Sequence, residues 1–256
     1  MLIEKRTSIP GAKIDTLSGN YIIYQPEKGQ RYSTDDMLVA WLSVKSAKTL
    51  FPSPNRFLDL GSGLCSVPMI FLWAFPVAEG CGLEISRDRF MLGTKSLEAN
   101  GLSCRFKLIN ADIRNKFLDE KFDIVTSSPP YYKKVEGPVS PNKDKAGVRF
   151  ELNGTIFDYF KSASHHIEAG GFFTTVYPFQ YAERVFDAAE KNDFCCDLRI
   201  DVIPKKTKPP LISLFRFLKG EKGLNEIETL TVRNKDQSFT EEYKAVRREL
   251  GFNVPA

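Results

Sequence analysis

The sequence predicts an α/β fold built on a mostly parallel sheet, and three observations support this prediction. Apolar strand-like segments alternate with helix-like segments between residues 57 and 192, which is the pattern of β-α-β units. The loop Gly61–Gly63 separates one such strand from the apolar helix-like segment Val67–Phe75. The segment Phe122–Tyr132 begins as a buried strand and ends at two prolines, which cannot continue a ladder. The chain therefore leaves the sheet at the carboxyl end of that strand, where open α/β sheets bind ligands.

Composition limits the class of protein. The 256 residues suit one large α/β domain with an elaboration, and 42% of them are hydrophobic. No apolar run reaches the roughly 18 residues of a membrane-spanning helix, so we expect a soluble, cytoplasmic protein without a membrane partner. The sequence does not set the oligomeric state, and we favour a monomer. The five cysteines have no CxxC spacing, and the two histidines, His165 and His166, are adjacent. We therefore expect neither a disulfide framework nor a metal site.

The N-terminal part predicts a helix that begins near residue 34. Ser33 or Thr34 can cap it, and Asp35–Asp36 fall in its first turn, where negative charge is favoured. Apolar residues follow at helical spacing from residue 37 to residue 42. A short strand-like piece at residues 21–24 precedes this helix.

Acidic residues follow two further strands. The predicted strand Phe57–Leu60 precedes the glycine loop, and the next predicted strand, Gly80–Ile85, ends in Glu84. An acid at this place can accept from two ribose hydroxyls, or can serve as the N-terminal acid of the next helix. Asp112 lies just beyond a third strand, Phe106–Ile109. It could receive the amino group of an adenine, or cap the turn that follows.

The rest of the chain extends the sheet. A long polar loop at residues 132–148 follows the two prolines, and loops of this length are usually lids, binding segments or disordered. Two late strands flank the sequence PKKTKPP and are expected to end the sheet as an antiparallel pair. The remaining elements are helices at 87–100, 149–167 and 180–192, strands at 172–178, 198–203 and 211–218, and a helix capped by Thr240.

The segment Ser128–Tyr131 presents a hydroxyl, backbone carbonyls and an aromatic ring side by side. Pro129 and Pro130 make this corner rigid. A planar base with an exocyclic amino group suits that set, because its ring can stack and its amine can donate to the oxygens. The alternative is a tight turn in which Tyr131 covers the core.

Taken together, the DLGSG loop, the two strand-end acids and the SPPY corner resemble the class I S-adenosylmethionine-dependent methyltransferases. The SPPY corner resembles the signature of enzymes that act on exocyclic or amide nitrogens. The resemblance implies a Rossmann-like, mostly parallel seven-stranded sheet with a C-terminal antiparallel strand pair. It also implies that S-adenosyl-L-methionine is the cofactor, held by Asp59, Gly61, Gly63, Glu84 and Asp112.

Three segments are similar to the bacterial enzymes that methylate the adenine amino group beside the anticodon of a valine tRNA. These segments are residues 25–42, 148–178 and 238–252. The chain departs from that family at Ser128, where the family has asparagine, and at Cys65, where it usually has glycine. Serine at the first position is familiar among enzymes that methylate the amino group of cytosine.

This resemblance implies an extension, residues 1–48, that packs on the cofactor site of a methyltransferase domain, residues 49–256. It places Tyr32, Thr34 and Asp35 against the cofactor. It assigns the catalytic roles to Ser128, Pro129, Pro130 and Tyr131.

The predicted function is methylation of an exocyclic amino group of a nucleobase, foremost adenine N6 in tRNA near the anticodon. RNA phosphates are expected to contact Lys133, Lys134, Lys205, Lys206 and Lys208, which border the proposed site. Each of these lysines taken singly could equally be part of a solvated face. Alternatives are methylation of an rRNA base, a DNA base or a protein glutamine, a non-catalytic RNA-binding protein on the same scaffold, and an NAD-dependent enzyme.

Overall fold

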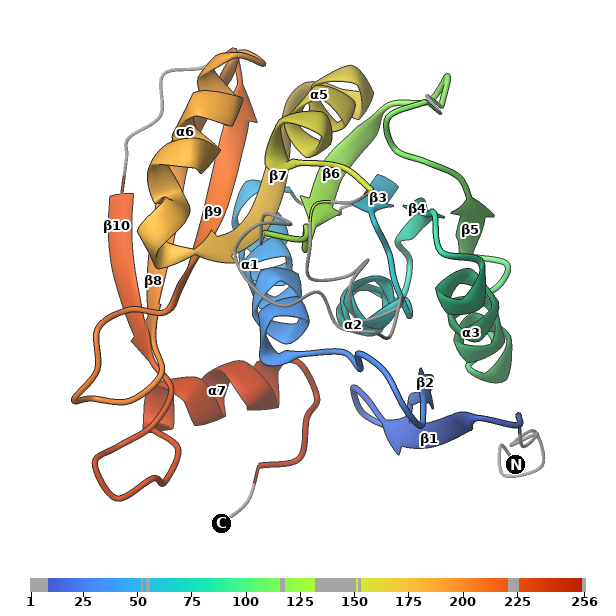
Figure 1. Ribbon diagram of the computed structural model, residues 1–256, viewed down its shortest axis with the longest axis horizontal. Helices are drawn as coiled ribbons and strands as arrows, with labels where there is room; N and C mark the ends of the chain where they lie inside the picture. The colour runs from blue at the N-terminus through green and yellow to red at the C-terminus, as the bar shows by residue number, and fades with distance from the viewer. Residues whose placement is uncertain are drawn as a thin grey trace.

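A computed structural model describes residues 9–51, 53, 56–115, 118–131, 151, 153–220 and 226–254. Its centre is an eight-stranded sheet with the strand order β10-β8-β9-β7-β6-β3-β4-β5. A separate antiparallel hairpin, β1 (Ala12–Thr16) with β2 (Ile22–Pro26), lies beside α3 near the β5 edge (Figure 1). In the described strands of the large sheet, β9 runs opposite to the other seven. The strands of that sheet are β3 (Arg56–Leu60), β4 (Glu79–Glu84), β5 (Phe106–Asn110), β6 (Phe122–Ser127), β7 (Ile167–Pro178), β8 (Phe194–Ile203), β9 (Ile212–Lys219) and β10 (Glu226–Thr231).

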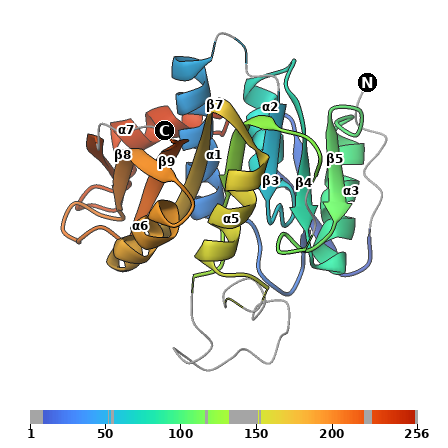
Figure 2. The ribbon, with the colours of Figure 1, turned by 90° about the horizontal axis from the view of Figure 1, so that it is seen from above.

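Helices cover both faces of the sheet, as the two views in Figure 1 and Figure 2 show. Residues of α1, α2, α3 and α7 belong to the core on one face, and residues of α5 and α6 belong to the core on the other. The helices are α1 (Thr34–Leu50), α2 (Ser66–Ala74), α3 (Arg87–Ala99), α5 (Ile156–His166), α6 (Ala182–Glu190) and α7 (Glu241–Glu249), with a short 3-10 turn, η2 (Phe179–Tyr181), before α6. In the described part of the chain no helix is long and apolar enough to cross a membrane.

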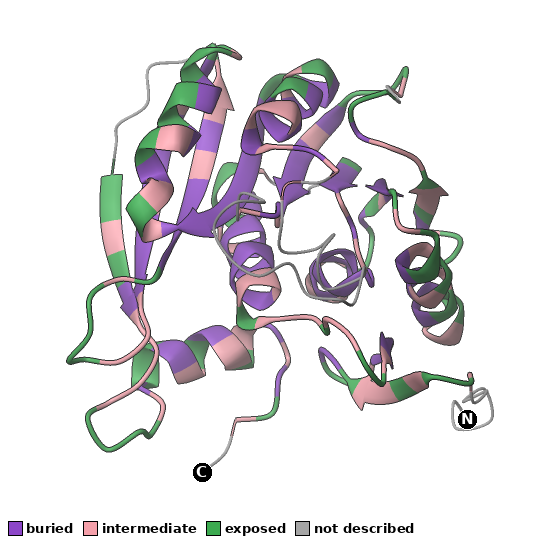
Figure 3. Cartoon of the chain, in the orientation of Figure 1, coloured by how far each residue is buried: buried purple, intermediate pink, exposed green. Residues whose placement is uncertain are grey.

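Strand alternation divides the apolar residues between the two cores. Phe57 faces one core and its neighbour Leu58 faces the other, and Ile124 and Val125 divide in the same way. Buried residues accordingly occupy the central strands (Figure 3). These strands are buried on both faces, which explains why they read as continuous apolar runs in the sequence.

The chain reverses its direction of winding at β3. It runs outward through β4 to β5 and then returns to place β6 on the other side of β3. Such a switch point opens a crevice at the carboxyl ends of the two adjacent strands. The glycine loop follows β3 and the two prolines follow β6, so both lie at this crevice.

The predicted fold class is confirmed, with two differences in the sheet. The sheet has an eighth strand, β10, because the weakly apolar segment Glu226–Thr231 pairs with β8. The antiparallel strand β9 lies between β7 and β8. Because β10 pairs with the outer side of β8, the predicted β8–β9 pair does not end the sheet. The division at residue 48 stays a prediction, although α1 packs in the same core as α2.

The predicted helix at 149–167 begins later than expected, at Ile156. Gly154 has a φ of +139°, which is outside the helical range. Thr155 and Asp158 then form a capping box, in which each side chain receives a backbone N–H of the other residue. Residues 149, 150 and 152 lie outside the described residues.

Candidate active site

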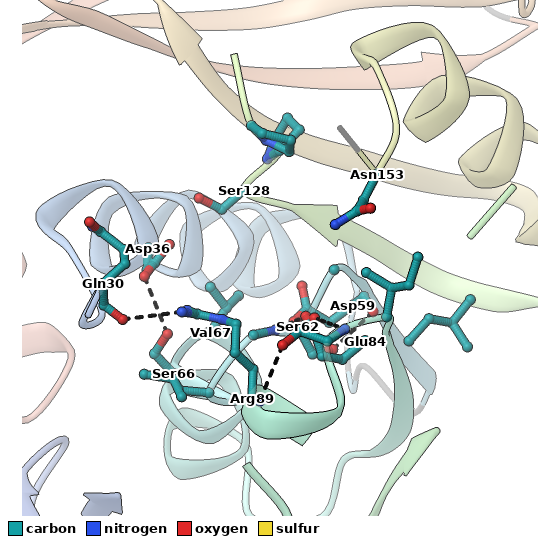
Figure 4. Close-up of a pocket in the computed structure, with 18 of the residues that line it drawn as sticks. Gln30, Asp36, Asp59, Ser62, Ser66, Val67, Glu84, Arg89, Ser128 and Asn153 are labelled. Atoms are coloured by element: carbon teal, nitrogen blue, oxygen red, sulfur yellow. Dashed lines mark hydrogen bonds between the residues drawn. The ribbon is translucent and has the colours of Figure 1, made fainter. Parts of the chain in front are cut away.

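A cavity of about 580 Å³ opens at the carboxyl ends of β3, β4 and β6 (Figure 4). Four segments that are distant in sequence line most of it: the approach to α1, the glycine loop, the β4–α3 turn and the corner after β6. Asn153 and Tyr159 complete the wall from the α5 side. The cavity therefore occupies the switch point of the sheet.

The glycine loop lines the base of the cavity. Gly61 and Gly63 have φ values of +74° and +54°, which favour glycine. The backbone N–H groups of Gly61 and Ser62 both donate to the Leu83 carbonyl at 2.9 Å, which ties the loop to β4. A side chain at Gly61 would meet the Tyr159 hydroxyl, because an added Cβ would lie 2.7 Å from it. Glycine at position 61 is thus required by the packing of Tyr159 against the loop backbone.

Glu84 is held rigidly at the end of β4. Its Oε2 accepts the Gly63 N–H at 2.7 Å and its Oε1 accepts the Ser86 N–H at 2.7 Å. Its exposed fraction is only 6%. Two backbone donors thus fix the Glu84 carboxylate at the wall of the cavity.

Asp59 lies at the floor of the cavity with an exposed fraction of 2%. Burial is the main cause that raises its pKa to about 8, and the nearby charges of Asp36 and Glu84 add to the effect. A hydrogen bond from Ser62 opposes this shift. Asp59 is therefore protonated in the folded protein at neutral pH.

Two neighbouring acids enter from the start of α1. Burial is also the main cause that raises the pKa of Asp35 to about 6, and the Asp36 charge adds to it. The Tyr131 hydroxyl donates to Asp35 Oδ2 at 3.4 Å. Asp36 forms a capping box with Ser33, whose N–H donates to Asp36 Oδ2 at 3.0 Å. The start of α1 is thus joined to the corner after β6.

The corner after β6 forms the opposite wall. Pro129 and Pro130 are buried, whereas Ser128 and Tyr131 are half-buried and line the cavity. The Tyr131 ring packs edge-on against Tyr177 of β7, with ring centres 5.9 Å apart and an interplanar angle of 74°. This contact fixes the plane in which the Tyr131 ring faces the cavity.

The Tyr177 hydroxyl is itself held by an ion pair. It donates to Glu151 Oε1 at 3.3 Å and accepts a hydrogen bond from Arg184 Nη1 at 3.0 Å. Arg184 also donates to Glu151 Oε2 at 2.7 Å. These bonds make Tyr177 a rigid support behind Tyr131.

Known methyltransferases resemble this chain in sequence and in fold. The chain is 26% identical over 231 residues to the tRNA1(Val) (adenine(37)-N6)-methyltransferase of Bacteroides thetaiotaomicron, covering 90% of this chain and 93% of that protein. A predicted O-methyltransferase of Agrobacterium tumefaciens superposes with a TM-score of 0.66 at 18% identity, covering 87% and 99% of the two chains. An S-adenosylmethionine-dependent methyltransferase of Clostridium acetobutylicum superposes with a TM-score of 0.53 at 12% identity, covering 74% and 93%. No family model matches the chain.

The chain is a class I S-adenosylmethionine-dependent methyltransferase. Its cavity fits the cofactor of that class. Gly61 and Gly63 line the cavity without side chains, and the Glu84 carboxylate lines it at the end of β4, where it can accept from a ribose hydroxyl. The acidic side chains around Asp59 suit the positive charge of a sulfonium.

Most of the residues that the sequence predicts for the site of the methyltransferase line this one cavity. Glu84 and Ser128, from strands on either side of β3, meet in it. The predicted residues that line it are Asp35, Asp59, Gly61, Gly63, Glu84, Ser128, Pro129, Pro130 and Tyr131.

Three predicted cofactor residues lie elsewhere. Asp112 does not line the cavity, although its neighbours Ala111 and Ile113 do. Its carboxylate accepts from Arg114, which lowers its pKa. Tyr32 and Thr34 line a separate cavity of about 460 Å³, together with residues of α7.

The predicted RNA-binding lysines divide into two groups. Lys205, Lys206 and Lys208 form the lysine turn, which connects β8 to β9. Because β8 is parallel to β6, this turn lies at the same edge of the sheet as the cavity. Lys133 and Lys134 lie outside the described residues.

Sequence reasoning missed several residues that line the cavity. Arg89 is buried and donates to the Gln30 carbonyl at 3.1 Å, across the mouth. Asn153 faces the cavity from the α5 side (Figure 4). Asp36 and Ser66 are joined by a hydrogen bond of 3.4 Å. The Ser33–Asp36 spacing is a capping-box signal in the sequence, whereas Arg89 and Asn153 depend on tertiary packing.

Proposed function

We propose that this methyltransferase modifies an exocyclic amino group of a nucleobase, with adenine N6 in tRNA near the anticodon as the target. The observation that carries the proposal is the position of Ser128 and Tyr131, which line the same cavity as Gly61, Gly63 and Glu84. The name of the Bacteroides relative, a tRNA1(Val) (adenine(37)-N6)-methyltransferase, supports the choice of base and RNA.

The cofactor side of the cavity is the glycine loop and the β4 end. Gly61 and Gly63 would let the backbone contact the cofactor, and the Glu84 carboxylate would accept from its ribose hydroxyls. When bound, S-adenosyl-L-methionine supplies an electrophilic methyl carbon attached to a sulfonium. Asp35, which lines the same cavity, adds negative charge near this cation.

The acceptor side is the corner after β6. The target base, unstacked or flipped from the RNA, stacks on the Tyr131 ring. Ser128 Oγ and the Pro129 carbonyl accept the two amine hydrogens, which draws the nitrogen lone pair out of conjugation and orients it toward the cofactor side. Pro130 keeps these acceptors in place because it fixes the backbone. Catalysis then comes mainly from orientation and exclusion of water.

The lysine turn supports an RNA substrate. β8 is separated from β6 by β9 and β7, so the turn lies three strand spacings from Ser128, about 14 Å at the usual spacing. Lys206 and Lys208 are exposed and Lys205 is half-buried. Phosphates of an RNA whose base occupies the cavity can reach this distance along the same edge.

The test is methyl transfer to bulk tRNA that lacks the modification, followed by digestion to nucleosides. We expect N6-methyladenosine from the wild-type protein and a loss of about fivefold to 150-fold in Tyr131→Ala, because base stacking on an aromatic ring is worth about 1–3 kcal/mol. Equal activity in the two proteins would reject the site. N4-methylcytidine would reassign the base, and no transfer to any RNA would reject the proposal.

A further inference from the structure

The second cavity, of about 460 Å³, adjoins the active-site cavity. Arg31 and Ser33 line both, so the two cavities meet at the approach to α1. Apart from two residues of β1, all the residues that line the second cavity belong to residues 25–42 and 238–252, two of the segments that the sequence singles out. The proposed function leaves this cavity without a role.

The second cavity differs from the first in charge. Among the described residues, its lining holds two arginines, Arg31 and Arg247, and a single acid, Asp15. In the lining of the active-site cavity, acids outnumber arginines. The second cavity is therefore the one of the two that suits an anion.

Arg247, on α7, is half-buried and supplies a positive charge to the second cavity. No carboxylate of the described residues forms a salt bridge with it. Its Nη2 donates to the Asn253 carbonyl at 2.8 Å, whereas its Nε–H is buried and has no hydrogen-bond partner among the described residues. The rings of Phe239 and Phe252 lie against the guanidinium, with centres 5.6 and 5.4 Å away. These contacts fix the side chain and leave its charge without a counterion.

Arg31 is exposed and can exchange its present partner for an anion. It contacts Asp15 at 3.6 Å, with side-chain exposed fractions of 42% and 41%, and such an exposed pair contributes little to stability. Asp15 also accepts from Gln25 Nε2 at 2.8 Å, so it keeps a donor when Arg31 turns away. Tyr32 and Tyr243 add two phenol groups to the lining. Burial is the main cause that raises the pKa of both, so their hydroxyls stay donors at neutral pH.

We propose that the second cavity is a phosphate subsite, in which Arg247 and Arg31 hold a phosphodiester of the RNA strand beside the target base. This inference rests on the proposed function. A guanidinium suits a phosphate because it can direct two N–H groups at two oxygens. The phosphates beside a flipped base lie within one nucleotide of it, and the second cavity meets the first at Arg31 and Ser33. The lysine turn, about 14 Å from Ser128 at the usual strand spacing, serves more distant nucleotides.

α7 connects the subsite with the lysine turn. Figure 1 shows α7 between the end of β10 and the β1–β2 hairpin, and residues of α7 and of that hairpin line the second cavity. The lysine turn is joined to the segment before α7, because the Lys206 N–H donates to the Arg233 carbonyl at 3.0 Å. A single RNA strand can thus run from the active-site cavity past Arg247 to the lysine turn.

The first test compares the tRNA affinity of the wild type, Arg247→Gln and Arg248→Gln at several salt concentrations. Arg248 is the matched control, because it follows Arg247 on α7 but is exposed and lines neither cavity. We expect Arg247→Gln to bind tRNA at least about tenfold more weakly, the usual loss for a charge-assisted hydrogen bond. Arg248→Gln should lose less than about threefold, because an exposed charge outside the subsite acts only through a screened field. Equal losses, or no loss in Arg247→Gln, would overturn the inference.

A change in the RNA tests whether the bound group is a phosphate. In an RNA hairpin that carries the anticodon loop, each phosphate beside the target base is replaced in turn by an uncharged methylphosphonate. At one position Arg247→Gln should then cost less than about twofold, because the contact is already lost. A full loss at every position would overturn the inference. S-adenosylhomocysteine affinity should stay within about twofold in Arg247→Gln, because Arg247 does not line the active-site cavity. A parallel loss of that affinity would mean that Arg247 only supports the fold, and would also overturn it.

NMR of the wild-type protein tests the subsite without RNA and without any variant. Added inorganic phosphate should shift the Nε–H resonance of Arg247. The Nε–H of Arg216, which donates to Asp197 at 2.9 Å, should keep its position. No shift at Arg247, or equal shifts at both arginines, would overturn the inference. If the wild-type protein transfers no methyl group to RNA, the proposed function fails, and the phosphate subsite is then judged by this titration alone.

Discussion

Asp59 gives the most direct test of the electrostatics of the cavity. Its pKa rises from 3.8 to about 8, chiefly because the carboxyl is buried. The unfolded chain therefore releases this proton near pH 4, whereas the folded protein keeps it until about pH 8. Protonation favours the folded state, so the free energy of unfolding falls as the pH rises through this window.

The size of the effect follows from the shift. Each pKa unit corresponds to about 1.4 kcal/mol, so between pH 5 and pH 7 ionisation of the unfolded chain removes about 3 kcal/mol of stability. No discount for solvent screening is needed, because the exposed fraction of Asp59 is 2%. Asp59→Asn has nearly the same shape but cannot ionise, so it lacks this dependence.

The assay is urea unfolding of both proteins without cofactor at pH 5, 6 and 7. We expect the variant to gain about 3 kcal/mol relative to the wild type across this range. A constant difference caused by the changed hydrogen bonding does not affect the result, because only the change with pH is compared. Parallel curves for the two proteins would refute a buried, protonated Asp59.

Three further predictions concern the loop, the acceptor ring and the RNA surface. Gly61→Ala should lose most S-adenosylhomocysteine affinity in calorimetry, because its Cβ would lie 2.7 Å from the Tyr159 hydroxyl. Gly101→Ala is the control: its φ is similar and nothing lies within 4 Å of the added Cβ, so it should lose only stability. Equal affinities of the two variants would contradict this prediction. Tyr131→Phe should raise the pKa of Asp35 above about 6 in an NMR titration, because the hydroxyl that donates to it is lost, and an unchanged value would mean that this bond is absent. Replacing the three residues of the lysine turn by alanine should weaken tRNA binding and leave cofactor affinity unchanged. The slope of log affinity against log salt concentration should become less negative by about 0.7 for each phosphate contact that is lost. Unaltered tRNA affinity would exclude the lysine turn from the RNA surface.

The sequence was sufficient for features that depend on local chemistry. The strand, glycine loop and helix at 57–75 could be predicted because Gly61 and Gly63 adopt backbone conformations that other residues avoid. The two prolines marked the end of β6 for an equally local reason. Parallel strands then bring their carboxyl ends to one edge, so Glu84 and Ser128 could be placed together without knowledge of any contact.

Features that depend on competition between partners could not be predicted. Asp112 has the expected place after β5, but Arg114, two residues later, takes its carboxylate at 2.6 Å. The late start of α5 is of a different kind: Gly154 and the capping box that begins at Thr155 are a local signal, which the prediction of a helix from residue 149 overlooked. β10 offered only a short, weakly apolar pattern, and its position depends on pairing with β8.

The acidic cavity and the basic lysine turn at this edge of the sheet suit different parts of an RNA substrate. Among the described residues that line the cavity, the acids outnumber Arg31 and Arg89: they are Asp35, Asp36, Asp59, Glu84 and Asp88. Such a lining suits a sulfonium and admits a neutral base, but it disfavours a phosphate, because the ionised carboxylates among these acids repel its negative charge. We infer that the base must be separated from its own backbone on entry, with the phosphates held outside the cavity. The lysine turn, at the same edge but three strand spacings from Ser128, has the charge and the position to hold them there.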